Sequence, residues 1–187
     1  MPRLVKFQSA HPGITLLINP TAELVELKPG GIDLAVRYSS RTAARPGVDA
    51  ILVDDMVVVG APALVDRADT ARPGDLLHLP WLQELGTNEV ADWFASHQVE
   101  VDRPPMISHM PGNLIMQAVR RGDGISYTAR SFVDDEIRSG RLRELFCDPL
   151  HGVYYLVTRP GVMRKPVRAF VSWMREEARK DGAAGLL

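Results

Sequence analysis

Residues 106–128 read MISHMPGNLIMQAVRRGDGISYT, and this stretch decides the fold. It predicts a strand over 106–109, a helix over 111–121 and a second strand over 124–128, with Gly122 and Gly124 between helix and strand. Apolar residues recur at helical spacing in the helix and are expected to face inward: Leu114, Ile115, Ala118 and Val119. A strand, a helix and a strand in close succession are typical of an α/β fold.

The same alternation continues on both sides of this stretch. Before it we expect helices over 3–11, 21–28 and 88–97, strands over 14–18, 33–38 and 81–84, and a long extended run over 51–61. After it we expect a helix over 130–139, strands over 142–146 and 153–158, and a final helix over 165–180. The strand, helix and strand within 14–38 predict a parallel sheet. The chain therefore reads as two α/β lobes with a ligand cleft between them.

Two of these helices have a predicted buried face. In 88–97 it contains Val90, Ala91 and Phe94, which leaves Trp93 off the apolar stripe and exposed. In the final helix it contains Val167, Phe170, Val171, Met174 and Ala178.

The composition excludes several classes of protein. Of the 187 residues, 45% are hydrophobic and 24% charged, and the net charge of −1 excludes a surface built throughout for nucleic acid. One cysteine, Cys147, excludes a disulfide framework and a cysteine-rich zinc site, and it suits a reducing compartment. No apolar run approaches the about 20 residues of a membrane helix, and the N-terminus lacks the apolar core of a signal peptide. We expect a soluble, cytoplasmic protein with no membrane partner.

No catalytic or metal-binding motif stands out. The histidines are scattered without metal-ligand spacing: His11, His78, His97, His109 and His151. The pair Asp54-Asp55 interrupts a long strand and suits a sheet edge or hinge, whereas Asp134 to Glu136 suit a solvated helix face. Ser108 and His109 are neighbours on a strand and point to opposite faces, so they cannot easily form a nucleophile and its base. Cys147 reads as a small buried residue. We expect no enzyme, no metal and no cofactor.

Polar residues at the strand ends are the candidates for a small-molecule site. The helix start at Gly112-Asn113 offers backbone N–H groups that can hold a carboxylate. Arg37 has two readings, as a clamp on an anionic ligand or as a structural ion-pair partner. The predicted ligand-binding residues are Arg37, Tyr38, Ser39, Ala61, Ser108, His109, Asn113, Tyr127 and Thr128.

Ordered short motifs along nearly the whole chain resemble the effector-binding domain of LysR-type transcriptional regulators, and among them the glycine-cleavage and β-lactamase activator branch. The first lobe contributes Phe7 with His11 to Ile14, and Gly31 to Arg37. The second contributes Pro73 to Leu77, Gly122 to Tyr127, and Gly140 to Phe146. The resemblance implies two Rossmann-like lobes joined by two crossing strands, similar to type 2 periplasmic binding proteins. Lobe 1 would contain residues 1–58 and 147–187, and lobe 2 residues 59–146.

The resemblance also implies a function, which is to bind a small effector in the cleft and modulate transcription. The family forms dimers or tetramers, and here the helix 4–11 would meet the partner's helix 88–97 through Trp93. Two departures stand out. The family's winged helix-turn-helix and linker helix have no counterpart here, and neither has the first strand of its effector domain. DNA contact is therefore expected only through that other part, and the basic residues from Arg164 to Lys180 read as a solvated helix face.

Two alternatives remain on the same architecture. A solute-binding protein of a transporter would need a signal peptide or a lipoprotein cysteine. An enzyme would need a catalytic pair facing the cleft, and fold alone does not choose among these functions.

Overall fold

The structure is a computed structural model that describes residues 2–21, 23–40 and 49–184. It divides into two compact units. Unit 1 contains Met1–Asn19, Leu24–Val53 and Gly152–Leu187, and unit 2 contains Pro20–Glu23 and Asp54–His151. Two long strands, β2 (Asp49–Gly60) and β6 (Arg143–Thr158), pass from one unit to the other.

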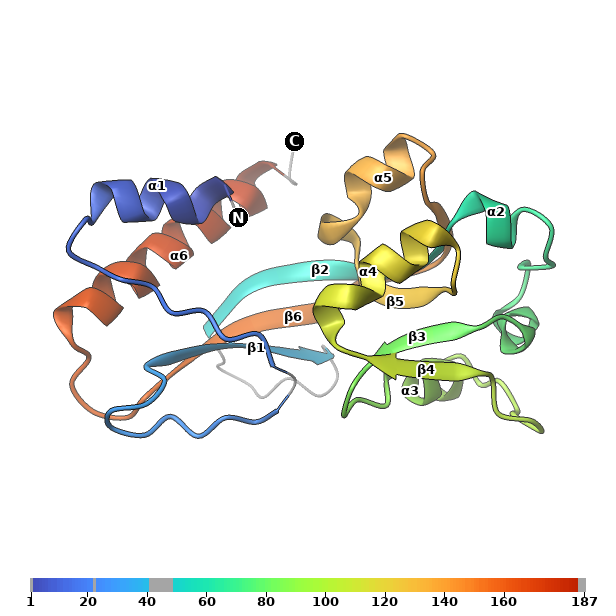
Figure 1. The fold of residues 1–187 in the computed structure, drawn as a ribbon, viewed down its shortest axis with the longest axis horizontal. Coiled ribbons are helices and arrows are strands. Elements are labelled where there is room, and N and C mark those ends of the chain that lie inside the picture. Colours follow the sequence, from blue (N-terminus) through green and yellow to red (C-terminus); the bar gives the residue numbers. More distant parts are fainter. Residues whose placement is uncertain (1, 22, 41–48, 185–187) are drawn as a thin grey trace. The chain divides into compact units, whose positions relative to one another are not determined.

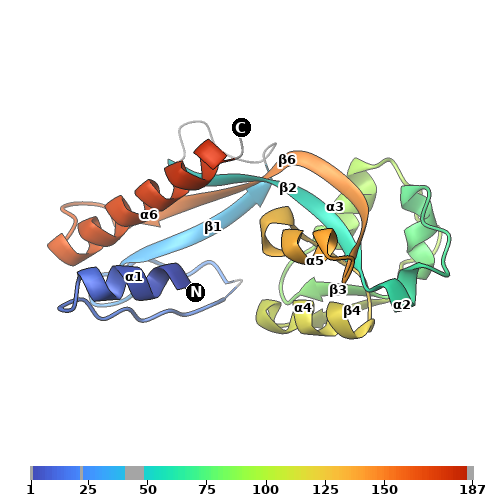
Figure 2. The same ribbon diagram turned by 90° about the horizontal axis from the view of Figure 1, so that it is seen from above.

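Unit 1 is built on two helices and an antiparallel strand pair. The strand β1 (Leu34–Ser40) pairs with the end of β6, in a register that runs from Leu34 opposite Thr158 to Ser40 opposite Gly152. The helix α1 (Pro2–Ala10) lies near α6 (Lys165–Ala184), as Figure 1 and Figure 2 show, and Phe7 of α1 packs against the rings of Phe170 and Trp173. The Phe7 ring centre lies 5.0 Å from that of Phe170 and 5.2 Å from that of Trp173, and Phe7 is buried.

The predictions for residues 14–28 are wrong. Residues 14–18 form no strand, and the described part of 21–28 forms no helix. The side chains of Leu17 and Leu24 are 96% and 81% exposed, so neither element buries an apolar face that would stabilise it. Thr21 makes only a local turn, in which its Oγ1 accepts a hydrogen bond from the Glu23 N–H at 3.1 Å. The parallel pairing inferred from this segment is also wrong, because β1 is antiparallel to β6.

Unit 2 holds the parallel pair instead. The strand β3 (Trp81–Glu84) runs parallel to β4 (Ile107–Met110), and α3 (Glu89–Ser96) lies in the crossover between them, as a parallel connection requires. Trp81 also bridges in parallel to Ile125, just before β5 (Ser126–Ala129), and β5 pairs antiparallel with residues 56–59 of β2. The larger sheet has the order β1-β6-β2-β5. The other helices are α2 (Pro62–Val65), η1 (Pro73–His78), α4 (Gly112–Arg121), η2 (Arg130–Phe132) and α5 (Asp134–Arg138).

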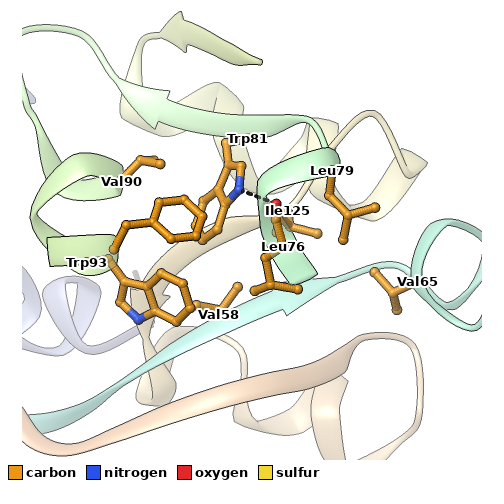
Figure 3. Close-up of a cluster of buried hydrophobic side chains, with 9 residues drawn as sticks. Val58, Val65, Leu76, Leu79, Trp81, Val90, Trp93 and Ile125 are labelled. Atoms are coloured by element: carbon orange, nitrogen blue, oxygen red, sulfur yellow. Dashed lines mark hydrogen bonds between the residues drawn. The ribbon is translucent and has the colours of Figure 1, made fainter. Parts of the chain in front are cut away.

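The buried run in β2 explains how the core of unit 2 is organised. Successive side chains of a strand point to opposite faces, so Val58 joins one hydrophobic cluster while Val57 and Val59 join another. The first cluster surrounds Trp81, whose indole N–H donates to the Leu76 carbonyl at 3.0 Å (Figure 3). The second contains the inward face of α4, namely Ile115, Ala118 and Val119.

Several predicted faces and boundaries need correction. The buried stripe of α3 is Val90, Trp93 and Phe94, and Ala91 is exposed. Leu114 is 44% exposed, because it lies at the edge of the inward face of α4. The helix expected over 130–139 divides into η2 and α5, and the strands expected over 142–146 and 153–158 are one strand, β6. The predicted helix over 165–180 is confirmed, and Val171 in its stripe is buried.

Candidate functional site

The strand ends of unit 2 bring some predicted residues to one edge. Trp81 is in register with Ile107 on one side and with Ile125 on the other, so the residues that follow in all three segments lie at the same level. Ser108 and His109 of β4 lie opposite Leu82 and Gln83, and both are exposed. The Ser126 hydroxyl ties the third segment to β3 by donating to the Leu82 carbonyl at 2.9 Å. The carboxyl ends of β3, β4 and β5 therefore meet at one edge, where an α/β sheet binds its ligands.

Tyr127 and Thr128 are half-buried on β5, and the Tyr127 hydroxyl is already engaged. It donates to Oδ2 of Asp148 at 2.7 Å, and Oδ1 of the same carboxylate lies 3.1 Å from Nε2 of His97. The His97 ring packs on Trp93 with ring centres 4.3 Å apart. Trp93 is therefore a core residue, only 3% exposed, and the prediction that it anchors a dimer interface is wrong. Among the side chains that the structure describes, Trp93 Nε1 is the buried polar atom without a hydrogen-bond partner.

The start of α4 is faced by a carboxylate of the same chain. A Cβ atom on Gly112 would lie 2.7 Å from Oε1 of Glu84, so only a glycine lets Glu84 approach this closely. Asn113 is exposed beside it. A negative charge is favourable at a helix N-terminus, so Glu84 stands where an anionic ligand was expected. Strand-end logic applied to the predicted strand 81–84 would have found Glu84.

The charge of Glu84 also affects a second carboxyl group, that of Glu89. Glu89, in the first turn of α3, is largely buried, and burial raises its pKa to about 7, with further contributions from the charges of Glu84 and Asp92. The Glu89 carboxyl is therefore partly protonated near neutral pH.

The remaining predicted residues lie elsewhere. Arg37, Tyr38 and Ser39 are half-buried on β1 in unit 1, where Tyr38 packs on Tyr154 and Ser39 donates to the Ser40 carbonyl. The Arg37 guanidinium donates to the Val25 carbonyl at 3.2 Å, and within the described ranges no carboxylate forms a salt bridge with it. The ion-pair reading of Arg37 is therefore not what the structure shows.

Ala61 precedes α2 and is buried. Its carbonyl accepts from the Leu64 N–H at 2.9 Å, and because only 5% of the residue is exposed, its side chain is part of the core.

The residues considered above as a catalytic nucleophile or as catalytic acids make contacts that stabilise the fold. Burial is the main cause that raises the pKa of the Cys147 thiol, and a hydrogen bond from Arg130 acts in the opposite direction. A raised pKa disfavours the thiolate, which is the reactive form. Asp54 and Asp55 accept hydrogen bonds from the backbone N–H groups of Ser131 and Leu150. In the part of the chain that the structure describes, no cluster of acidic, histidine and cysteine residues could hold a metal, and no helix is long and apolar enough to cross a membrane.

Comparisons with known proteins converge on one group. Residues 1–179 match the family model of the LysR substrate binding domain. The transcriptional activator AmpR of Rhodobacter capsulatus is 31% identical over 83% of this chain and 54% of its own length. The AhcY transcriptional activator HvrB of the same species is 27% identical over 95% of this chain, which spans 61% of that relative. These relatives are transcriptional regulators, not enzymes.

Solved structures agree on the fold. The effector domain of AmpR from Pseudomonas aeruginosa superposes with a TM-score of 0.73 at 22% identity, covering 100% of this chain and 91% of that one. The full-length virulence activator AphB of Vibrio cholerae gives a TM-score of 0.64 at 17% identity, over 95% of this chain and 63% of that one. The predicted α/β class, with its type 2 periplasmic-binding-protein-like architecture, is confirmed.

Proposed function

The chain belongs to the LysR substrate-binding domain family, and from this premise we propose that it binds a small effector carrying a carboxylate and thereby regulates transcription. The relatives favour a regulator over the solute-binding alternative, because those it matches are named as transcriptional activators. The chain spans about 61% of the length of HvrB, so DNA recognition is assigned to another part of the whole regulator.

The observation that carries the ligand class is Arg37. Its guanidinium is half-buried and contacts a backbone carbonyl, and no acidic side chain of the described residues neutralises it. A guanidinium has five N–H donors, so it keeps donors for a carboxylate after bonding to Val25. The strand ends of unit 2, where Ser108, His109 and Asn113 are exposed, are a second candidate place for a carboxylate, taken for that unit alone. An effector carboxylate at the start of α4 would displace Glu84.

A thermal-shift screen of small carboxylates tests this proposal. At least one compound should raise the melting temperature, as binding to the folded state requires. Arg37→Gln should weaken the binding of that compound by about 1.5–3 kcal/mol, which is the range for a hydrogen bond to a charged group. Arg168→Gln is the control, because Arg168 is an exposed arginine of the same unit. If only neutral or cationic compounds raise the melting temperature, the proposal that the effector carries a carboxylate is wrong.

Several basic residues in and just before α6 are paired with acidic residues, which supports the proposal that this chain alone does not bind operator DNA. Arg164 bonds Asp33 at 2.6 Å, Arg175 bonds Asp49 at 3.1 Å, and Lys180 pairs with Glu177 within its own helix. Charges paired in this way contribute little net attraction for phosphates. A gel-shift titration with the 187-residue chain should therefore show no sequence-specific retardation.

The assembly is a homodimer or tetramer in this proposal, formed without Trp93. The outward face of α1, where Val5 is 63% exposed, remains the candidate contact. Sedimentation equilibrium should show association that Val5→Asp weakens, and a monomer at all concentrations would exclude it.

A further inference from the structure

Two adjacent acidic residues hold both long strands at the place where they leave unit 2. The division between the units falls after Val53 on β2 and after His151 on β6. Asp54 and Asp55 are thus the first residues of unit 2 on β2. Oδ2 of Asp54 accepts from the Ser131 N–H at 3.1 Å, and Oδ1 of Asp55 accepts from the Leu150 N–H at 2.8 Å. Asp55 therefore connects β2 to β6 two residues before β6 enters unit 1 at Gly152.

Leu150 has a backbone conformation that needs such support. Its φ is +50°, in the left-handed region, and only Gln98 shares this among the non-glycine residues that the structure describes. A left-handed residue with a Cβ atom costs about 1–2 kcal/mol and persists where its surroundings fix it. The bond from its N–H to Asp55 is one such constraint, and it lies at the unit boundary.

Arg130 links the same two strands a second time. Its Nε lies 3.6 Å from Oδ2 of Asp55 on β2, and its Nη2 pairs closely with Glu144 on β6. The side chains of Arg130 and Asp55 are only 31% and 32% exposed, so water screens this attraction incompletely. Asp55 uses one oxygen for the Leu150 amide and the other for Arg130, and each link involves β6.

We propose that Asp55, held by Arg130, is a latch that fixes the directions in which β2 and β6 leave unit 2 and so limits movement between the two units. Hinge movements are absorbed by a few residues that change φ and ψ. Leu150 is such a residue, and the latch restrains it. This inference rests on contacts within unit 2 and does not depend on which effector binds.

Electron–electron distance measurements between two spin labels test the latch. The labels go on Val162→Cys in unit 1 and Val101→Cys in unit 2, which replace residues 96% and 43% exposed. The background is Cys147→Ser, which removes the native thiol and keeps an acceptor for Arg130. Asp55→Ala should broaden the distance distribution. Asp66→Ala, which removes an exposed carboxylate paired with Arg143 in unit 2, should leave it unchanged.

Hydrogen exchange and a second variant keep the test decisive. Asp55→Ala should also remove the protection of the Leu150 amide. Asp55→Asn keeps an acceptor for that amide and loses the charge facing Arg130, so it should broaden the distribution less, and it replaces the alanine variant if that one does not fold. If the Leu150 amide loses its protection in an Asp55 variant while the distance distribution stays narrow, the latch is wrong. The latch is also wrong if the distribution is already broad in the doubly labelled protein that keeps Asp55.

Discussion

Replacing Glu89 with glutamine should stabilise the protein above neutral pH and not in acid. Glu89 is mostly buried in the first turn of α3, and burial together with the charge of Glu84 raises its pKa from 4.5 to about 7. Between these two pH values the folded protein holds a proton that the unfolded chain has released. The free energy of unfolding therefore falls as the pH rises through this window.

The size of this effect follows from the shift in pKa. The shift from 4.5 to about 7 spans about 2.5 pKa units at about 1.4 kcal/mol each, so about 3 kcal/mol is expected. Glu89→Gln removes the charged form altogether. Its free energy of unfolding should exceed that of the unsubstituted protein by about 3 kcal/mol at pH 8 and match it at pH 4.

Urea unfolding followed by tryptophan fluorescence at several pH values measures this difference, because Trp81 and Trp93 lie in the adjoining core. Glu100→Gln, an exposed carboxyl in the same unit, is the control and should change stability at neither pH. A Glu89→Gln variant that is less stable at pH 8, or equally stabilised at pH 4 and 8, would refute the reasoning.

Two further predictions use matched or neighbouring residues. Trp81→Phe should cost more free energy of unfolding than Trp93→Phe, by about 0.5–1.5 kcal/mol in urea titrations, because only Trp81 donates a side-chain hydrogen bond, to a Leu76 carbonyl that also accepts from the Leu79 N–H; equal costs would contradict the assigned hydrogen bond. Glu84→Gln should lower the pKa of Glu89, visible by NMR titration, and should tighten binding of a carboxylate found in the screen, because it removes the charge facing α4; unchanged binding would separate Glu84 from the ligand site.

The sequence predicted the elements that bury an apolar face in this chain. The helix 111–121 and the strands on either side of it are confirmed within two residues at each end, because Ile115, Ala118 and Val119 pack on the buried strand β2. The predictions of a strand and a helix over 14–28 are wrong because these segments bury no apolar face. Their apolar residues, such as Leu17, remain exposed, and local propensity without burial does not sustain a strand.

The sequence could predict that several candidate residues of unit 2 lie at one edge, and it could not predict which acidic residues lie near them. Strand-end reasoning brought Ser108, His109 and Tyr127 to one edge of unit 2. It could not show that Asp148 engages the Tyr127 hydroxyl or that Glu84 faces Gly112, because these partners meet only through the folded chain. The prediction that Trp93 is exposed is wrong because two apolar stripes fit helical spacing equally well. The predicted stripe was Val90, Ala91 and Phe94, and the buried stripe is Val90, Trp93 and Phe94.

The central claim is that this domain binds a small carboxylate at its strand ends, and an NMR titration of the labelled chain with a carboxylate from the thermal-shift screen tests it most directly. The amide signals of residues 37–39 in unit 1, or those of residues 108–110, 112–113 and 127–128 in unit 2, should shift in a saturable way, and Arg37→Gln should raise the concentration needed for half-saturation at unit 1. Saturable shifts confined to other surfaces, such as the outer face of α6, would contradict the claim.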